Sequence, residues 1–132
     1  MGPGLTLDTG ALVALEKAAA RGVPSVAAGI VARAISRRVR VTVPSAVVVE
    51  WWRDQRGPAA TILRGIDVEP LSHDLARIAG AALAKCGEGP SPVDAVVVAS
   101  AAQRGDIVYT SDLDDLERVR NAAFPAVRIL RI

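Results

Sequence analysis

The sequence predicts an α/β domain of three layers, α/β/α, with a short central parallel sheet. Short apolar segments alternate along the chain with longer segments whose apolar residues recur at helical spacing. The short segments lack the regular polar alternation of a half-exposed strand, which indicates a sheet buried on both faces. The chain has 132 residues, of which 51% are apolar. That is enough for one core, so we expect a single domain over residues 1–132.

The chain begins with one predicted strand and two predicted helices. Residues 5–7 form an apolar run that ends at Asp8, as expected of a short buried strand. Residues 10–17 carry Ala, Leu and Val at helical spacing. A second helix is predicted over about residues 23–38, because its apolar residues fall on a single stripe.

The next part of the chain contains two predicted strands, at residues 41–43 and 66–69. Each of these apolar runs is followed by a proline, which favours the end of a strand. Two helices are predicted between them, over residues 45–53 and about 59–63. A Gly-Pro pair separates the two helices, and such pairs interrupt regular structure.

The last part of the chain predicts three helices and two strands. A serine begins the helix over residues 72–85, and Ser-Pro begins the helix over residues 91–103. A Gly-Glu-Gly-Pro loop lies between these two helices. Apolar runs predict strands at residues 106–110 and 127–130, with a helix over about residues 112–121 between them.

Cysteine, histidine and charge exclude several classes of protein. The chain has one Cys and one His, which are too few for a structural zinc site or an intrachain disulfide. A protein without disulfides is typical of a reducing compartment, so we expect a cytoplasmic location. The 16 basic and 14 acidic residues leave a net charge of +2, which permits contact with phosphates without requiring it. No apolar run approaches the ~18 residues of a membrane span.

Four acidic residues lie at the predicted strand ends or near the starts of the following helices. They are Asp8, Glu50, Asp94 and Asp112. Because the carboxyl ends of parallel strands share one edge of the sheet, we expect all four side chains at that edge. Taken singly, each residue also has a structural explanation. Asp8 fits a turn and Glu50 an ion pair. Asp94 fits a capping box with Ser91, and Asp112 fits a helix cap. Taken together, four converging carboxylates repel one another unless a cation or a proton neutralises them.

A site made only of carboxylate oxygens suits a hard cation such as Mg²⁺ or Mn²⁺. Such an ion can activate a water molecule and stabilise the charge that develops on a phosphate group. The chemistry needs no Cys, His or Lys, in agreement with a composition poor in all three. Metal-assisted hydrolysis of a phosphodiester bond is therefore the reaction that these residues favour.

The chain resembles the PIN-domain ribonucleases, in particular the VapC-type toxins of bacterial toxin–antitoxin systems. Four segments carry the resemblance: Leu-Asp-Thr-Gly-Ala-Leu at 7–12, Pro-Ser-Ala-Val-Val-Val-Glu-Trp-Trp at 44–52, Ser-Pro-Val-Asp-Ala at 91–95 and Tyr-Thr-Ser-Asp-Leu-Asp-Asp-Leu at 109–116. The family pattern falls on the same four acidic residues, with Asp115 as an additional candidate. The resemblance implies a Mg²⁺- or Mn²⁺-dependent endoribonuclease that cleaves RNA, forms a homodimer and is inhibited by an antitoxin protein.

We assign roles to these residues as hypotheses. Asp8, Asp94 and Asp112 are expected to hold the metal, and Glu50 to hold or deprotonate the attacking water. Hydroxyl groups are expected to fix the carboxylates in place, and the candidates are Thr9, Thr110 and Ser111.

Basic and aromatic residues next to Glu50 are further candidates. Arg53 and Arg56 are candidates for contacts with RNA phosphates, and a surface role fits them equally well. Trp51 and Trp52 can stack on bases. We expect instead that one of them lies in the core and the other in a protein interface.

One function of a different class stays open at this stage. The chain can also be a non-catalytic or phosphate-binding α/β module whose acidic pocket is structural. A haloacid dehalogenase-type phosphatase is disfavoured, because it needs a second Asp two residues after Asp8 and Gly10 stands there. A metal titration distinguishes the open alternatives, because a module without a metal site would not gain thermal stability from Mg²⁺ or Mn²⁺.

Overall fold

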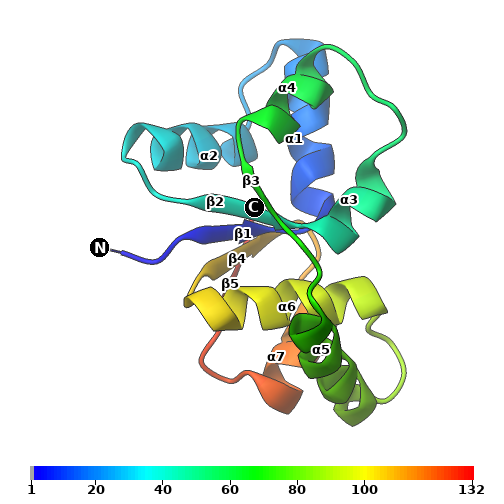
Figure 1. The fold of residues 1–132 in the computed structure, drawn as a ribbon. Helices are drawn as coiled ribbons and strands as arrows, with labels where there is room; N and C mark the ends of the chain where they lie inside the picture. Colours follow the sequence, from blue (N-terminus) through cyan, green and yellow to red (C-terminus); the bar gives the residue numbers. More distant parts are fainter. Residues whose placement is uncertain (1) are drawn as a thin grey trace.

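A computed structural model describes residues 2–132, and its centre is a parallel sheet of five strands (Figure 1). The strand order is β3-β2-β1-β4-β5, so the first strand lies in the middle of the sheet. All neighbouring strands run parallel, as the sequence predicted. The strands are β1 (Leu5–Leu7), β2 (Val41–Pro44), β3 (Asp67–Glu69), β4 (Ile107–Thr110) and β5 (Arg128–Arg131).

Helices cover both faces of the sheet in the described chain (Figure 1). One layer contains α1 (Thr9–Arg21), α2 (Val26–Ser36), α3 (Ser45–Trp51) and α4 (Pro58–Arg64). The other contains α5 (His73–Cys86), α6 (Pro92–Arg104) and α7 (Asp114–Ala123). The predicted three-layer α/β/α class is therefore confirmed.

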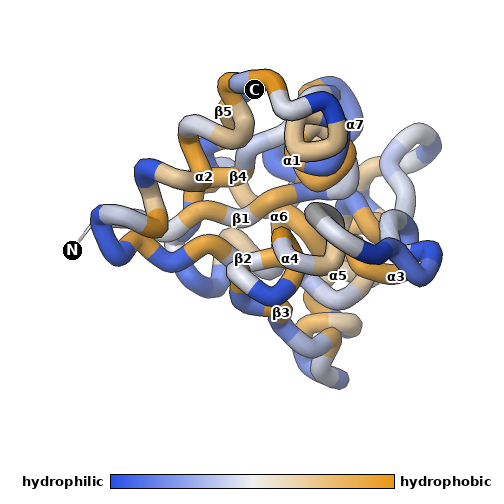
Figure 2. The backbone as a smooth tube through the Cα atoms, turned by 90° about the horizontal axis from the view of Figure 1, so that it is seen from above, coloured by the Kyte–Doolittle hydropathy of each residue, from blue (hydrophilic) through white to orange (hydrophobic). Residues whose placement is uncertain are grey.

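Apolar side chains from both helical layers meet the sheet. Leu7 and Val43 are fully buried on the face that α1 and α2 cover, and α6 is buried along most of its length on the other face. Figure 2 shows apolar segments in the middle of the molecule, along β1 and α6. α6 packs against three of the short strands, β1, β2 and β4. This packing fixes the first turn of α6 relative to the edge of the sheet.

A buried polar cluster holds the far end of α6. The guanidinium of Arg104 donates to Thr6 Oγ1 at 2.8 Å, to Ser100 Oγ at 2.8 Å and to Asp106 Oδ2 at 2.9 Å. It also pairs with Glu69 at the end of β3. The cluster therefore links the last turn of α6 to three strands. Burying these charges is tolerable because each has a partner.

Several predicted boundaries differ from the structure. The helix predicted over residues 10–17 extends to Arg21, and the helix predicted over residues 23–38 covers only Val26–Ser36. Pro44 is part of β2 and pairs in register with Glu69 of β3, although we predicted that proline would end the strand. The helix predicted over residues 45–53 ends at Trp51, because the backbone of Trp52 is already extended with a ψ of 127°. The helix predicted from Asp112 begins at Asp114. Asp112 instead accepts a hydrogen bond from the Asp114 N–H through its side chain.

Within residues 2–132, no single helix is long and apolar enough to cross a membrane. α1 and α2 reach the length and apolar composition of a membrane span only when they are counted together, and the two helices are bent by 99° relative to each other.

Candidate active site

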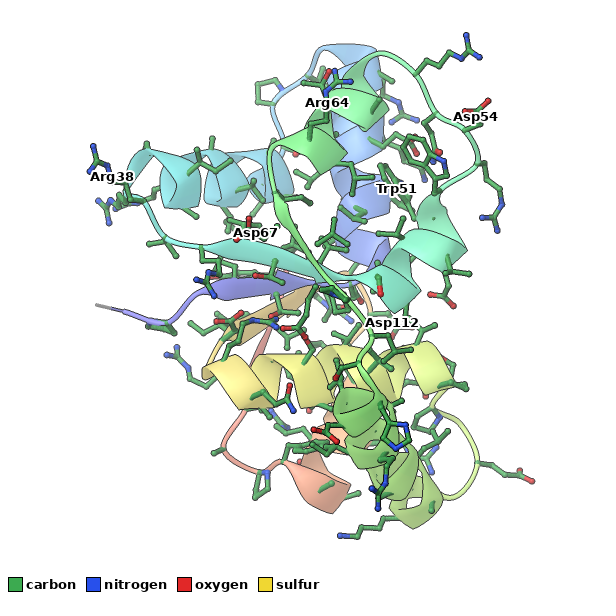
Figure 3. The ribbon with its side chains drawn as sticks, viewed as in Figure 1. Arg38, Trp51, Asp54, Arg64, Asp67 and Asp112 are labelled. Carbon is green, nitrogen blue, oxygen red and sulfur yellow. The ribbon has the colours of Figure 1, made fainter. Side chains whose placement is uncertain are left out.

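The four predicted acidic residues line one pocket at the carboxyl edge of the sheet. Asp8 directly follows β1, and Asp112 lies two residues after β4. Glu50 comes from α3, which follows β2, and Asp94 comes from the first turn of α6. The pocket has a volume of about 160 Å³ and is also lined by Asp115. Figure 3 shows Asp112 at this edge, in the region between α3 and α6.

Asp8 is fixed by contacts to two elements. Its Oδ1 accepts a hydrogen bond of 2.8 Å from the N–H of Ala11 and so caps the start of α1. Its Oδ2 accepts from the hydroxyl of Thr110, at the end of β4. The Asp8 carboxylate therefore joins neighbouring strands at the base of the pocket.

Asp94 takes part in the predicted capping box of α6. Its Oδ2 accepts a hydrogen bond of 2.8 Å from the N–H of Ser91, and its own N–H donates to Ser91 Oγ at 3.1 Å. The capping interpretation of Asp94 is thus confirmed. It is compatible with a place in the pocket, because the same first turn of α6 lies against the other carboxylates.

Hydroxyl groups hold two further parts of the pocket wall. The Thr9 hydroxyl donates to Glu50 Oε1 at 2.6 Å, which joins α1 to α3. Thr110 Oγ1 accepts from the N–H of Asp112 at 2.9 Å and lies 2.8 Å from the Asp112 carbonyl oxygen. The predicted contacts of Thr9 and Thr110 with carboxylates are therefore present. Ser111 lines the pocket, but among the described residues its hydroxyl makes no hydrogen bond to a carboxylate.

Burial raises the pKa of two carboxyl groups in the pocket. Desolvation is the main reason that the pKa of Asp8 is raised, and the charges of Asp94 and Asp112 add to it, while the Thr110 and Ala11 hydrogen bonds oppose it. Desolvation likewise raises the pKa of Asp94, with Asp115 and Glu50 adding to the effect and the Ser91 hydrogen bonds opposing it. In both groups burial is the main cause that disfavours the charged carboxylate, and the neighbouring carboxylates add to it.

The residues of the pocket fit a divalent cation by their chemistry. All five acidic groups are oxygen donors, and none takes part in the ion pairs found among the described residues. As the side chains stand in residues 2–132, no three acidic, His or Cys groups converge closely enough to hold an ion. The donor set and the unpaired charge therefore suit Mg²⁺ or Mn²⁺, and binding would require the carboxylates to close in.

The two predicted basic candidates near Glu50 make other contacts. Arg53 donates to the carbonyl oxygens of Val49 at 3.0 Å and Trp52 at 2.7 Å, at the end of α3. Arg56 faces Asp54 at 3.8 Å, and both side chains are largely exposed. Their suggested contacts with RNA stay predictions.

The sequence did not indicate one cation beside the pocket, the guanidinium of Arg118. Arg118 follows the pocket residue Asp115 by three positions on α7, and its guanidinium donates to the carbonyl oxygen of Cys86 at 3.0 Å. It lies over Gly89, where an added Cβ would overlap the guanidinium and would come 3.4 Å from Asp115 Oδ1. The spacing of three residues from Asp115 on one helix was the available signal.

The neighbouring tryptophans differ in their surroundings. Trp51 is 4% exposed and belongs to the core, whereas Trp52 is half-buried at the end of α3. One tryptophan thus lies in the core, as predicted. The interface role expected for the other stays a prediction.

Comparison with known proteins gives a family and a set of similar folds. The sequence model of the PIN domain family matches residues 5–122. No curated protein matches the chain by sequence. Among solved structures, a chain of VapBC2 from Rickettsia felis bound to a promoter DNA fragment is 13% identical, with a TM-score of 0.71; 97% of this chain and 98% of that chain are covered.

Two further solved structures share the fold. A chain of DNA-bound VapBC from Salmonella typhimurium is 20% identical, with a TM-score of 0.67 and 98% of each chain covered. A chain of VapBC-5 from Mycobacterium tuberculosis, a member of the VapBC family of toxin-antitoxin systems, is 24% identical, with a TM-score of 0.56; 98% of this chain and 100% of that chain are covered. At these identities the likeness concerns the fold.

Proposed function

The chain belongs to the PIN domain family, and from this membership we propose that it is a Mg²⁺- or Mn²⁺-dependent endoribonuclease that acts as the toxin of a toxin–antitoxin pair. The observation that carries the proposal is the pocket in which Asp8, Glu50, Asp94 and Asp112 gather from distant parts of the chain. A cluster of unpaired carboxylates is unfavourable for stability alone. It is explained when a divalent cation is part of the working protein.

Asp8, Asp94 and Asp112 would hold the cation, and Asp115 is an additional candidate at the rim of the pocket. When bound, a divalent cation lowers the pKa of a coordinated water and neutralises charge on the phosphate. The carboxylates of Asp8 and Asp94 are held by hydrogen bonds at opposite sides of the pocket. These hydrogen bonds place the two carboxylates at the cap of α1 and the cap of α6, from which they would have to close in on a cation.

Glu50 would hold or deprotonate the attacking water. It is exposed, and its Oε1 is oriented by the hydroxyl of Thr9. An exposed carboxylate beside two partly buried ones can accept a proton from the attacking water and release it again. Thr9 acts here as a positioning residue, because it contacts Glu50 and not the reacting atoms.

Arg118 is the cation that we place next to the RNA. It lies beside Asp115 at the rim of the pocket and makes no ion pair among the described residues. A guanidinium with spare N–H donors is suited to an RNA phosphate. We propose that it holds the strand near the pocket, in addition to the predicted candidates Arg53 and Arg56.

The proposal includes two protein partners. The three solved structures named above are described as VapBC2, VapBC and VapBC-5, and the last is described as a member of a family of toxin-antitoxin systems. By that likeness we propose that an antitoxin protein binds this chain and that the chain forms a homodimer. A place in the cytoplasm, where the RNA is, is part of the same proposal.

A pair of neighbouring aspartates offers the test. Asp112 lines the pocket, whereas Asp114 is exposed at the first turn of α7 and does not. Both substitutions, Asp112→Asn and Asp114→Asn, remove one negative charge with little change of shape. We expect Asp112→Asn to reduce Mg²⁺-dependent cleavage of total RNA by at least about 100-fold, since oriented groups that stabilise charge are worth that much. Asp114→Asn should cleave like the wild type.

Equal cleavage by Asp112→Asn and the wild type would reject the assignment. If neither the wild type nor Asp114→Asn cleaves RNA, and if Mg²⁺ and Mn²⁺ leave the melting temperature unchanged, the protein is instead a non-catalytic module with a structural acidic pocket.

A further inference from the structure

A second polar pocket lies at the opposite edge of the sheet, where the strands begin. It has a volume of about 540 Å³, within the range of about 300–1,000 Å³ typical of small-ligand pockets. Three strand residues separate Gly4 in this pocket from Asp8 in the acidic one, so the two residues are about 13 Å apart along the strand. Figure 3 shows Arg38 at one end of the molecule, far from Asp112. We call this the arginine pocket, and its charged lining residues are Arg37, Arg38, Arg40, Arg104 and Asp106.

The arginine pocket has more positive charge than its own carboxylate can balance. Asp106 already accepts hydrogen bonds of 2.9 Å from both Arg104 and Thr6. Arg40 has a carboxylate partner, Asp67, at 3.7 Å, but both side chains are more than 60% exposed.

Arg37 and Arg38 remain as the two unpaired cations. Among the described residues, neither side chain has a carboxylate within 4.0 Å, and both are exposed. The pocket therefore offers two free guanidinium groups and a third that is weakly held. Guanidinium groups in this number favour a ligand with several phosphate oxygens.

The backbone at Arg38 is held in a conformation that usually belongs to glycine. The chain leaves α2 through a Schellman turn, in which Arg38 N–H donates to the Ile35 carbonyl at 3.0 Å and Val39 N–H to the Ala34 carbonyl at 2.8 Å. Arg38 takes the left-handed position with a φ of 59°. A side chain with a Cβ is strained there, and such strain is found where a side chain is used.

We propose that the arginine pocket is a binding site for phosphate groups, separate from the acidic pocket, with Arg37, Arg38 and Arg40 as the ligand-binding residues. The phosphates can belong to a free polyphosphate compound or to the backbone of a nucleic-acid strand. Both sources present the same oxyanions to the guanidinium groups. The site does not depend on the proposed nuclease activity, because it shares no residue with the acidic pocket.

Arg38→Gly is the decisive variant, because it removes the guanidinium and also relieves the backbone. Its melting temperature without ligand should equal or exceed that of the wild type, so that loss of binding cannot be ascribed to misfolding. Two controls are matched to it. Asp54→Gly relieves the other non-glycine residue with a positive φ, and Arg64→Gln removes one charge from α4.

The first measurement is binding of pyrophosphate in EDTA, by calorimetry. We expect the wild type and both controls to bind, and Arg38→Gly to bind at least about tenfold more weakly, as for the loss of a hydrogen bond between charged groups. The second is fluorescence anisotropy of a labelled single-stranded DNA in EDTA. DNA is used because the proposed nuclease would not cleave it under these conditions.

The two measurements separate the sources of phosphate. If pyrophosphate binding alone depends on Arg38, the site serves a small polyphosphate ligand. If binding of the oligonucleotide depends on Arg38, the site serves a nucleic-acid backbone. In that case the slope of log Kd against the logarithm of the salt concentration should fall by about 0.7 in Arg38→Gly. Binding of both probes that is equal in Arg38→Gly and the wild type, or absent from the wild type, would overturn the proposal.

Discussion

Thr110→Val removes one hydroxyl from beneath the acidic pocket and leaves a side chain of nearly the same shape. Thr110 is fully buried. Its hydroxyl donates to Asp8 and accepts a hydrogen bond of 2.9 Å from the N–H of Asp112. The variant therefore takes a donor from one proposed metal-binding residue and an acceptor from the backbone of another.

The cost of the change follows from these two contacts. A hydrogen bond to a charged group contributes about 1.5–3 kcal/mol, and one to a backbone N–H about 0.5–1.5 kcal/mol. Thr110→Val should therefore lower the free energy of unfolding by about 2–4 kcal/mol in EDTA at neutral pH. For a domain of this size that is a fall in melting temperature on the order of 10 °C.

Thr42→Val is a control of the same chemistry. Thr42 is also buried in the sheet, but its hydroxyl has no hydrogen-bond partner among the described residues. Removing an unpaired buried hydroxyl should cost nothing and can stabilise the protein by about 1 kcal/mol. Urea denaturation of the two variants and the wild type gives both values. Equal losses of stability in Thr42→Val and Thr110→Val would refute the reasoning.

The pH dependence of the Thr110→Val effect is a second signature. The hydrogen bond from Thr110 favours the ionised form of Asp8 and so opposes the rise in its pKa. Its contribution is present while Asp8 is ionised. The difference in stability between the variant and the wild type should therefore shrink as the pH falls through the raised pKa of Asp8.

Three further predictions concern single charges. Because the pKa of Asp8 is raised in the folded protein, protonation of Asp8 stabilises the fold most below the ordinary value of 3.8, and this stabilisation is lost as the pH rises through the raised pKa. Asp8→Asn should therefore make the free energy of unfolding of the metal-free protein depend less on pH. Urea denaturation from acid to neutral pH measures this dependence. Arg104→Met should lower the free energy of unfolding by about 3–5 kcal/mol, because it leaves Asp106 buried without its cation. Adding Asp106→Asn should restore part of this loss. A loss below about 1 kcal/mol in Arg104→Met would contradict the stabilising role of the buried polar cluster around Arg104. Arg118→Gln should raise the KM for RNA about tenfold and leave the metal-induced rise in melting temperature intact, as thermal denaturation with Mn²⁺ would show.

The gathering of the acidic residues could be predicted from the sequence. In a parallel sheet all carboxyl ends share one edge, so that finding the strands also finds the edge. Asp8 follows β1 directly and Asp112 lies two residues after β4, while Glu50 and Asp94 lie within the helices that approach the same edge. The prediction needed only the order of elements, and errors of up to four residues at their ends did not change it.

The partners of individual side chains could not be predicted in the same way. Thr42 and Thr110 both stand in short strands, yet one hydroxyl is unpaired and the other makes contacts to two proposed metal-binding residues. The difference arises from strand register and from which helix covers the face. Arg53 illustrates the same limit, because the sequence does not indicate that its guanidinium donates to the carbonyl oxygens at the end of α3. Its contact with RNA stays a prediction.

Calorimetric titration of Mn²⁺ into the purified protein measures most directly whether the gathered carboxylates share a cation. We predict that the wild type and the exposed-site variant Asp114→Asn bind Mn²⁺, and that Asp8→Asn loses at least about 1.4 kcal/mol of binding free energy, a factor of ten in affinity. Binding of equal strength by Asp8→Asn and the wild type, or no binding by the wild type, would contradict the proposed metal centre.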